Sequence, residues 1–110
     1  MKTNNPRATI RPKQIKRERL EVTYPIVGGL ENRRIQDYIN GVIFNIVEET
    51  IRKQGYYDNP ETEITGIYYI RTNAECLLSI SIEIYAFSGG AHGFTILESV
   101  TFDLRTGTRY

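Results

Sequence analysis

The single histidine of the chain lies in a glycine-rich segment, which is the first place to look for chemistry. This segment, called here the 88–93 loop, consists of Ser88, Gly89, Gly90, Ala91, His92 and Gly93. Its glycines permit positive φ and close backbone approach, and the imidazole of His92 can donate or accept a hydrogen bond. We expect the loop either to form a wide structural turn in which His92 bonds the backbone, or to contact a ligand.

Known catalytic and cofactor-binding motifs do not fit this loop. A nucleophile elbow needs glycine two residues before its serine, but position 86 is Ala, and no second histidine is present to act as the base. A dinucleotide-binding loop joins a strand to a helix, whereas the flanking pattern here predicts two strands. One His and one Cys are too few for a zinc site. We therefore expect no catalysis, no metal and no cofactor.

Carboxylates are scattered along the chain. Glu83 and Asp103 are expected on the same outer face of a sheet, where an acid–base pair is conceivable. Nothing in their spacing brings them together, so we interpret them as solvated charges.

The predicted outer face of the sheet is too apolar for a fully solvated surface. Tyr69, Tyr85 and Phe87 lie there with Ile67 and Leu77, among smaller hydroxyl-bearing residues. Either the N-terminal strand or a following domain covers this face, or the face binds a protein or a glycan. The candidate binding residues are therefore the 88–93 loop, Tyr69, Tyr85 and Phe87.

Residues 30–54 have the pattern of an amphipathic helix. Apolar residues recur at spacings of three and four: Ile35, Tyr38, Ile39, Val42, Ile43, Ile46, Val47 and Ile51. Arg52 and Lys53 suit the last turn, and Gly55 suits the position after it. Gly41 costs about 1 kcal/mol in a helix, so we expect close packing against the sheet at that point.

Four segments alternate as strands do, within about 14–27, 64–71, 76–86 and 94–104. We predict an α+β fold, with one amphipathic helix on a mostly antiparallel sheet of about four strands, in the order β-α-β-β-β. If the even-numbered residues of both strands face the helix, the hairpin loop between them must have an odd number of residues. We therefore predict a three-residue loop at 73–75, with Tyr68 opposite Ile80 and Ile70 opposite Leu78. Glu98 falls on the apolar face, and we attribute this to a bulge near Leu97 rather than to the sheet's rim.

The composition predicts one domain. We expect residues 1–13 to be a disordered basic arm and residues 14–110 to form a single domain, followed by a second domain in longer relatives. Residues 1–21 carry seven Lys/Arg and two Glu, a charge of 7 − 2 = +5. A solvated tail explains this charge better than nucleic-acid binding does.

A single cysteine excludes an internal disulfide, and no apolar run is long enough for a membrane helix or a signal peptide. Membrane attachment would need an anchor that this sequence lacks.

The C-terminal residues predict a hairpin turn over 105–108, with glycine at position 107. Little chain follows this turn, so the last strand is expected to leave an unpaired edge that could pair with another copy.

Two motifs carry a family resemblance. The stretch 85–93 contains Gly-Gly-Ala-His-Gly, and the stretch 102–107 reads Phe-Asp-Leu-Arg-Thr-Gly. Together with Tyr24-Pro25 and the helix containing Asn40, they resemble the bacterial domain of unknown function found before the catalytic domain of the peptidoglycan deacetylase PdaC and in the extracellular part of the anti-sigma factor RsiV.

The resemblance implies an extracellular or cell-envelope setting and an accessory role, with deacetylation belonging to another domain. We therefore expect a non-catalytic, ligand-binding domain with a protein or cell-wall glycan partner. The alternative is a cystatin-like inhibitor, or a sensor of a hydrolase such as lysozyme.

Overall fold

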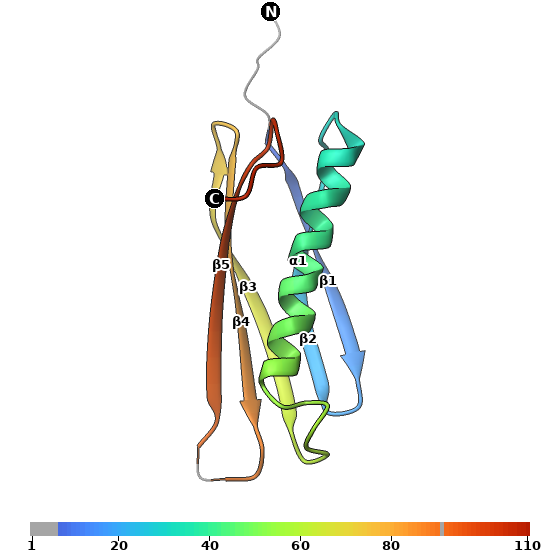
Figure 1. Ribbon diagram of the computed structural model, residues 1–110, viewed down its shortest axis with the longest axis vertical. Helices are drawn as coiled ribbons and strands as arrows, with labels where there is room; N and C mark the ends of the chain where they lie inside the picture. Colours follow the sequence, from blue (N-terminus) through green and yellow to red (C-terminus); the bar gives the residue numbers. More distant parts are fainter. Residues whose placement is uncertain (1–6, 91) are drawn as a thin grey trace, which may run out of the picture.

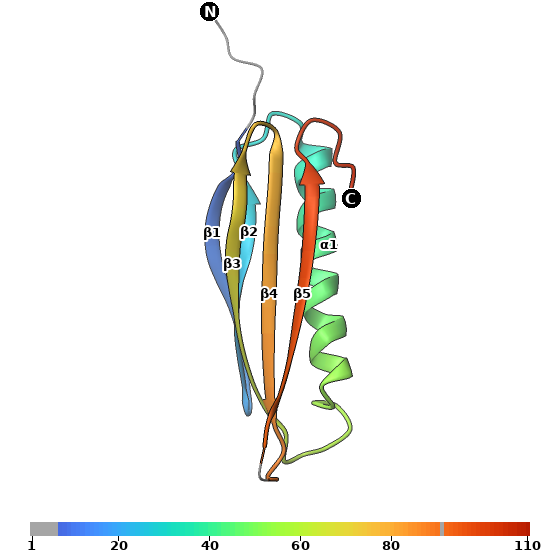
Figure 2. The same ribbon diagram turned by 90° about the vertical axis from the view of Figure 1, so that its left-hand side faces the viewer.

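The computed structural model describes residues 7–90 and 92–110. One helix, α1 (Arg33–Lys53), lies on one face of a single sheet. The strands are β1 (Thr9–Arg17), β2 (Leu20–Gly28), β3 (Glu63–Ala74), β4 (Leu77–Phe87) and β5 (Phe94–Asp103), in the spatial order β1-β2-β3-β4-β5. Every neighbouring pair is antiparallel except β2 and β3, which are parallel and joined through α1. The predicted α+β class is confirmed, and Figure 2 shows the helix and the sheet as two layers.

The sheet has five strands rather than four, because the N-terminal region is a hairpin. β1 pairs with β2 along its whole length, and Arg19 turns the chain with a φ of 61°. The prediction that residues 1–13 are disordered is wrong for residues 9–13, which belong to β1; residues 1–6 lie outside the described part. Pro12 argued for a break, but β1 is an edge strand, where proline is tolerated.

The predicted helix is confirmed within a few residues. Asn32 caps it by accepting hydrogen bonds from the N–H groups of Arg34 and Ile35. Its buried face consists of Ile39, Ile43, Val47, Thr50 and Ile51, packed against the strands. A Cβ added at Gly41 would meet nothing within 4 Å, so the expectation of close packing there is wrong.

A side-chain amide fastens the N-terminal hairpin to the helix. β2 is paired with β3 only over Leu20–Val22, and further along β2 the N–H of Val27 donates to Asn40 Oδ1 at 2.8 Å. Asn40 Nδ2 in turn donates to the Val27 carbonyl at 2.9 Å. Asn40 thus supplies the two hydrogen bonds that a neighbouring strand would otherwise make.

The predicted register of the β3–β4 hairpin is wrong. Tyr68 lies opposite Ile82, and Ile70 lies opposite Ile80. The loop has two residues, Glu75 and Cys76, both at positive φ (53° and 69°), as a type I′ turn requires. A register shift between Ile70 and Thr72 absorbs the difference, because one extra residue reverses which face the following side chains occupy.

The position of Glu98 on the apolar face is explained by its place at the rim of the sheet and not by a bulge. The β4–β5 ladder is continuous from Leu77↔Asp103 to Ala86↔Phe94, with Glu98 opposite Ile82. Because β5 is an edge strand, the carboxylate reaches Lys53 Nζ at 3.8 Å. The predicted C-terminal turn is present, with Gly107 at a φ of 81°.

Candidate binding surface

The sheet face opposite α1, called here the outer face, is uncovered by any described element (Figure 2). It exposes five large apolar side chains: Ile67 (46%), Tyr69 (37%), Leu77 (37%), Tyr85 (39%) and Leu97 (53%). β1 extends the sheet beside β2 instead of folding over this face, so the alternative of coverage by the N-terminal strand is wrong. Phe87, the remaining predicted aromatic, is half-buried opposite Glu63.

The exposed rings are spread along the strands. Tyr85 on β4 lies opposite Thr65, whereas Tyr69 on β3 is four residues beyond Thr65 and lies opposite Ser81. At about 3.3 Å per residue, the two tyrosines are separated by roughly 13 Å along the strand direction. Ile67 stands between them on β3. The arrangement is a long apolar strip and not a pocket.

Rows of hydroxyl groups cross the same face. Ser81 Oγ lies 2.9 Å from Ser99 Oγ, and Ser79 Oγ lies 2.9 Å from Thr101 Oγ1. A hydroxyl can both donate and accept, so exposed Ser99 and half-buried Ser79 and Thr101 can still bond to a ligand. Ser81 is buried, at 3% exposure, and supports this row from below. These hydroxyl pairs on β4 and β5 lie directly beside the apolar strip.

Arg71 connects the rows of hydroxyl groups to the apolar strip. Its Nε donates to Ser81 Oγ at 3.1 Å, and its guanidinium lies 4.7 Å from the centre of the Tyr69 ring. Alternation places Arg71 on the same face as Tyr69, but sequence reasoning did not select it as a binding residue because its bond to Ser81 joins two strands. Leu97 and Ser99 were missed because the expected bulge near Leu97 obscured which face they occupy.

The described part of the 88–93 loop contacts the outer face at Gly93. A Cβ on Gly93 would overlap the hydroxyl end of the Tyr85 ring, so a larger residue here would displace this ring. Ser88 Oγ lies 2.9 Å from Thr62 Oγ1, and Gly89 has a φ of 88°. His92 is exposed and has no hydrogen bond to any described residue. Ala91 lies outside the described residues.

The carboxylates do not form an acid–base pair. Glu83 lies opposite Leu97 and Asp103 lies opposite Leu77, which places them six residues apart along β4, or about 20 Å. Asp103 is instead held by Arg105, whose Nη2 lies 3.1 Å from its Oδ2. The hydrogen bond from the Arg105 side chain, together with one from its backbone N–H, lowers the pKa of Asp103. Among residues 7–90 and 92–110, no three His, Cys, Asp or Glu side chains converge as metal ligands.

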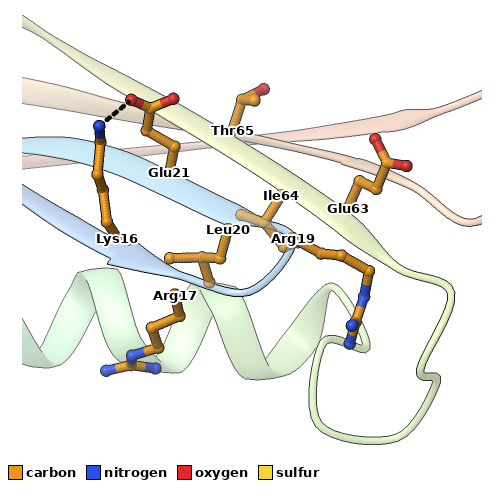
Figure 3. Close-up of a pocket in the computed structure, with 8 residues that line it drawn as sticks. All are labelled: Lys16, Arg17, Arg19, Leu20, Glu21, Glu63, Ile64 and Thr65. Carbon is orange, nitrogen blue, oxygen red and sulfur yellow. Dashed lines mark ion pairs between the residues drawn. The ribbon is translucent and has the colours of Figure 1, made fainter.

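A hollow of about 330 Å³ lies where β1 and β2 meet the start of β3 (Figure 3). It is lined by Lys16, Arg17, Arg19, Leu20, Glu21, Glu63, Ile64 and Thr65. Lys16 pairs with Glu21 at 3.6 Å, and Figure 3 shows Arg17 and Arg19 turned away from the two carboxylates.

Both arginines of this hollow have partners inside the domain. Arg17 donates to Glu48 and to the Tyr57 hydroxyl, each at 2.7 Å, and the Glu48 bond raises the pKa of Arg17. Arg19 donates to the Thr62 carbonyl at 3.3 Å. This part of the basic N-terminal region therefore stabilises the fold, and its cations do not converge on an anion site.

Comparison with known proteins identifies the fold. Residues 14–95, about three quarters of the chain, match the family described as Deacetylase PdaC. A solved DUF3298-family protein from Bacteroides fragilis has a TM-score of 0.58 at 12% identity, and another from Pseudomonas aeruginosa has 0.57 at 14%. They cover 94% and 98% of this chain, which spans 57% and 56% of their own lengths. At these identities the likeness shows the fold alone. No curated protein matches the chain.

Proposed function

This chain belongs to the Deacetylase PdaC family, and we propose that it is a non-catalytic accessory domain whose outer face binds a glycan strand of the bacterial cell envelope. A location outside the membrane, in an envelope or secreted protein, is part of this proposal. Within the described residues, no helix has the length and hydropathy needed to cross a bilayer.

One observation carries the proposal: exposed tyrosine rings and rows of hydroxyls share a sheet face that no described element covers. A sugar ring has apolar C–H faces and a rim of hydroxyls. Tyrosine offers an apolar ring with a polar tip, and serine and threonine supply both donors and acceptors. An exposed apolar patch edged with polar groups is typical of an interaction site. The wide spacing of the carboxylates favours binding over hydrolysis.

Cosedimentation with purified peptidoglycan tests this proposal. We expect the parent protein to bind, and Tyr69→Ala and Tyr85→Ala each to weaken binding about threefold to tenfold, because each removes a contacting ring. Tyr38→Ala is the matched control, since Tyr38 is 53% exposed but lies on α1, across the sheet from the outer face. Circular dichroism checks that each variant folds.

Two results would refute the proposal. One is the absence of parent binding. The other is equal binding by the parent and by both outer-face variants, which would place the contact elsewhere.

The alternative is an inhibitor or sensor of a hydrolase such as lysozyme. It is favoured by the exposed His92 in the connection between β4 and β5, which lies at one end of the sheet (Figure 1). A lysozyme pull-down in which His92→Ala abolishes capture and Tyr69→Ala does not would support this alternative over glycan binding.

A further inference from the structure

The guanidinium of Arg71 is held in a fixed orientation on the outer face. Its Nε donates to Ser81 Oγ at 3.1 Å, and its central carbon lies 4.7 Å from the centre of the Tyr69 ring. All three residues belong to the β3–β4 hairpin. One edge and one face of the planar group are therefore occupied. Its two terminal nitrogens bond to no described residue, so their N–H groups remain available to a ligand.

The hydrogen bonds around Ser81 have a definite direction. Ser81 is 3% exposed, so its hydroxyl hydrogen needs an acceptor inside the protein. Ser99 Oγ, at 2.9 Å, is the acceptor that the described residues offer. Ser81 thus accepts from Arg71 and donates to Ser99. Because the oxygen of exposed Ser99 already accepts this bond, the O–H of Ser99 is left to donate to a ligand.

The cluster of Arg71, Tyr69, Ser81 and Ser99 therefore directs mainly hydrogen-bond donors outward. Within residues 7–90 and 92–110, no carboxylate forms an ion pair with Arg71. An unpaired cation surrounded by donors is complementary to an anion. The two terminal nitrogens of a guanidinium form a fork that matches the two oxygens of a carboxylate.

The charges on the rest of the outer face favour a sparsely charged ligand. Glu63 and Glu83 lie there opposite Phe87 and Leu97, and no cation of the described residues forms an ion pair with either. A polymer with a phosphate on every repeat would bring negative charge against these carboxylates and be repelled. A strand of neutral sugar rings with occasional carboxylates avoids this repulsion.

We propose that Arg71, supported by Tyr69 and Ser81, is a subsite for a carboxylate of a peptidoglycan strand. This inference rests on the proposed function and names the group that the outer face recognises. Peptidoglycan combines neutral sugar rings with carboxylates on its peptides. One carboxylate is held by the terminal nitrogens of Arg71, and the sugar rings extend along the apolar strip towards Tyr85, which lies roughly 13 Å from Tyr69 along the strands. The Ser99 hydroxyl donates to a neighbouring acceptor on the same strand.

Cosedimentation with two forms of one peptidoglycan preparation tests this subsite. The preparation is first freed of phosphate polymers, and part of it is treated with carbodiimide and methylamine, which converts carboxylates to neutral amides. We expect the parent to bind the untreated form about threefold to tenfold more tightly than the amidated form. Arg71→Gln should bind both forms as weakly as the parent binds the amidated form, because it lacks the charged fork.

Arg52→Gln is the matched control. The Arg52 guanidinium also lies over a tyrosine, 5.3 Å from the centre of the Tyr57 ring, but it belongs to α1 on the other side of the sheet. This variant loses the same charge and should distinguish the two forms as the parent does. Tyr85→Ala should weaken binding to both forms by the same factor, because its ring contacts sugar and not the carboxylate. Circular dichroism verifies the folding of each variant.

Two outcomes would overturn the subsite. One is an Arg71→Gln variant that prefers the untreated form as strongly as the parent does, and the other is a parent that binds both forms equally. In either case, weaker binding by Tyr85→Ala would leave glycan binding by the outer face intact. A parent that binds neither form would refute the subsite and the proposed function together.

Discussion

Replacing Asn40 with Ala should destabilise the domain, although only one small polar side chain on the helix is lost. The side chain bonds both the N–H and the carbonyl of Val27, at 2.8 and 2.9 Å. Val27 is 1% exposed and both bonds are part-buried, so water replaces them only in part while the hairpin stays on the helix.

The magnitude follows from two backbone groups that lose their partners. Each unsatisfied buried group costs about 1–3 kcal/mol, and partial access of water at this site favours the lower half of that range. The loss is therefore about 2–4 kcal/mol. Alanine returns roughly 0.6 kcal/mol through its higher helix propensity. The net destabilisation remains a large fraction of the roughly 5–15 kcal/mol expected for a small domain.

Urea unfolding followed by circular dichroism measures this loss, and Asn45→Ala is the matched control. Asn45 lies on the same helix and is exposed, and its side chain has no hydrogen bond to any described residue. Both substitutions gain the same helix propensity, so the difference between the two variants isolates the Val27 bonds. We expect Asn45→Ala to match or slightly exceed the stability of the parent, and Asn40→Ala to fall about 2–4 kcal/mol below Asn45→Ala.

Equal stability of the two variants would refute the idea that Asn40 fastens the hairpin. Amide hydrogen exchange provides a second readout, because the Val27 amide should lose protection in Asn40→Ala and keep it in Asn45→Ala.

Two further predictions concern single residues. Gly41→Ala should stabilise the domain by about 0.5–1 kcal/mol, because the added methyl meets nothing within 4 Å and alanine favours the helix; an unchanged or lower melting temperature would contradict this. The pKa of Asp103 is lowered in the folded protein, chiefly by the hydrogen bond from the Arg105 side chain. The ionised carboxylate therefore stabilises the fold at any pH above the pKa of about 3.9 that it has in the unfolded chain. This stabilisation is lost as the pH falls through the lower pKa of the folded protein. Urea unfolding should therefore show Asp103→Asn less stable than the parent at pH 7, with a gap that narrows steadily below about pH 4; a gap independent of pH would show that the carboxylate charge is not the cause.

Local patterns were sufficient for the helix and for the strands that face it. The three- and four-residue spacing of Ile39, Ile43 and Val47 places them on one side of any α-helix, and these three residues are buried. Alternation likewise identified the interior faces of β3, β4 and β5. For the helix and the middle of these strands the local periodicity and the burial agree. At the strand ends they do not, because Ile70 and Phe94 on the helix-facing side are 39% and 73% exposed.

The register of the strands and the identity of the edge strands could not be predicted from local patterns. The type I′ turn at Glu75 and Cys76 lacks glycine, so the usual signal of a two-residue hairpin was missing. Pro12 indicated a break, but it is accommodated because β1 has a neighbour on one side only. Glu98 suggested a bulge, but it is accommodated because Lys53 approaches across the open edge of β5. Each correction depends on which segment lies beside which.

The sequence by itself determined the α+β class, the helix, the interior faces of the last three strands and the outward placement of Tyr69 and Tyr85, because these follow from periods of 3.6 and 2 residues along the chain. Only the tertiary structure decided that the N-terminal hairpin extends the sheet, that none of the described elements lies over the outer face, and that Arg71 and Ser99 join its polar rows. Those features depend on contacts between segments distant in sequence, such as Asn40 with Val27 and Arg71 with Ser81, which no local pattern specifies.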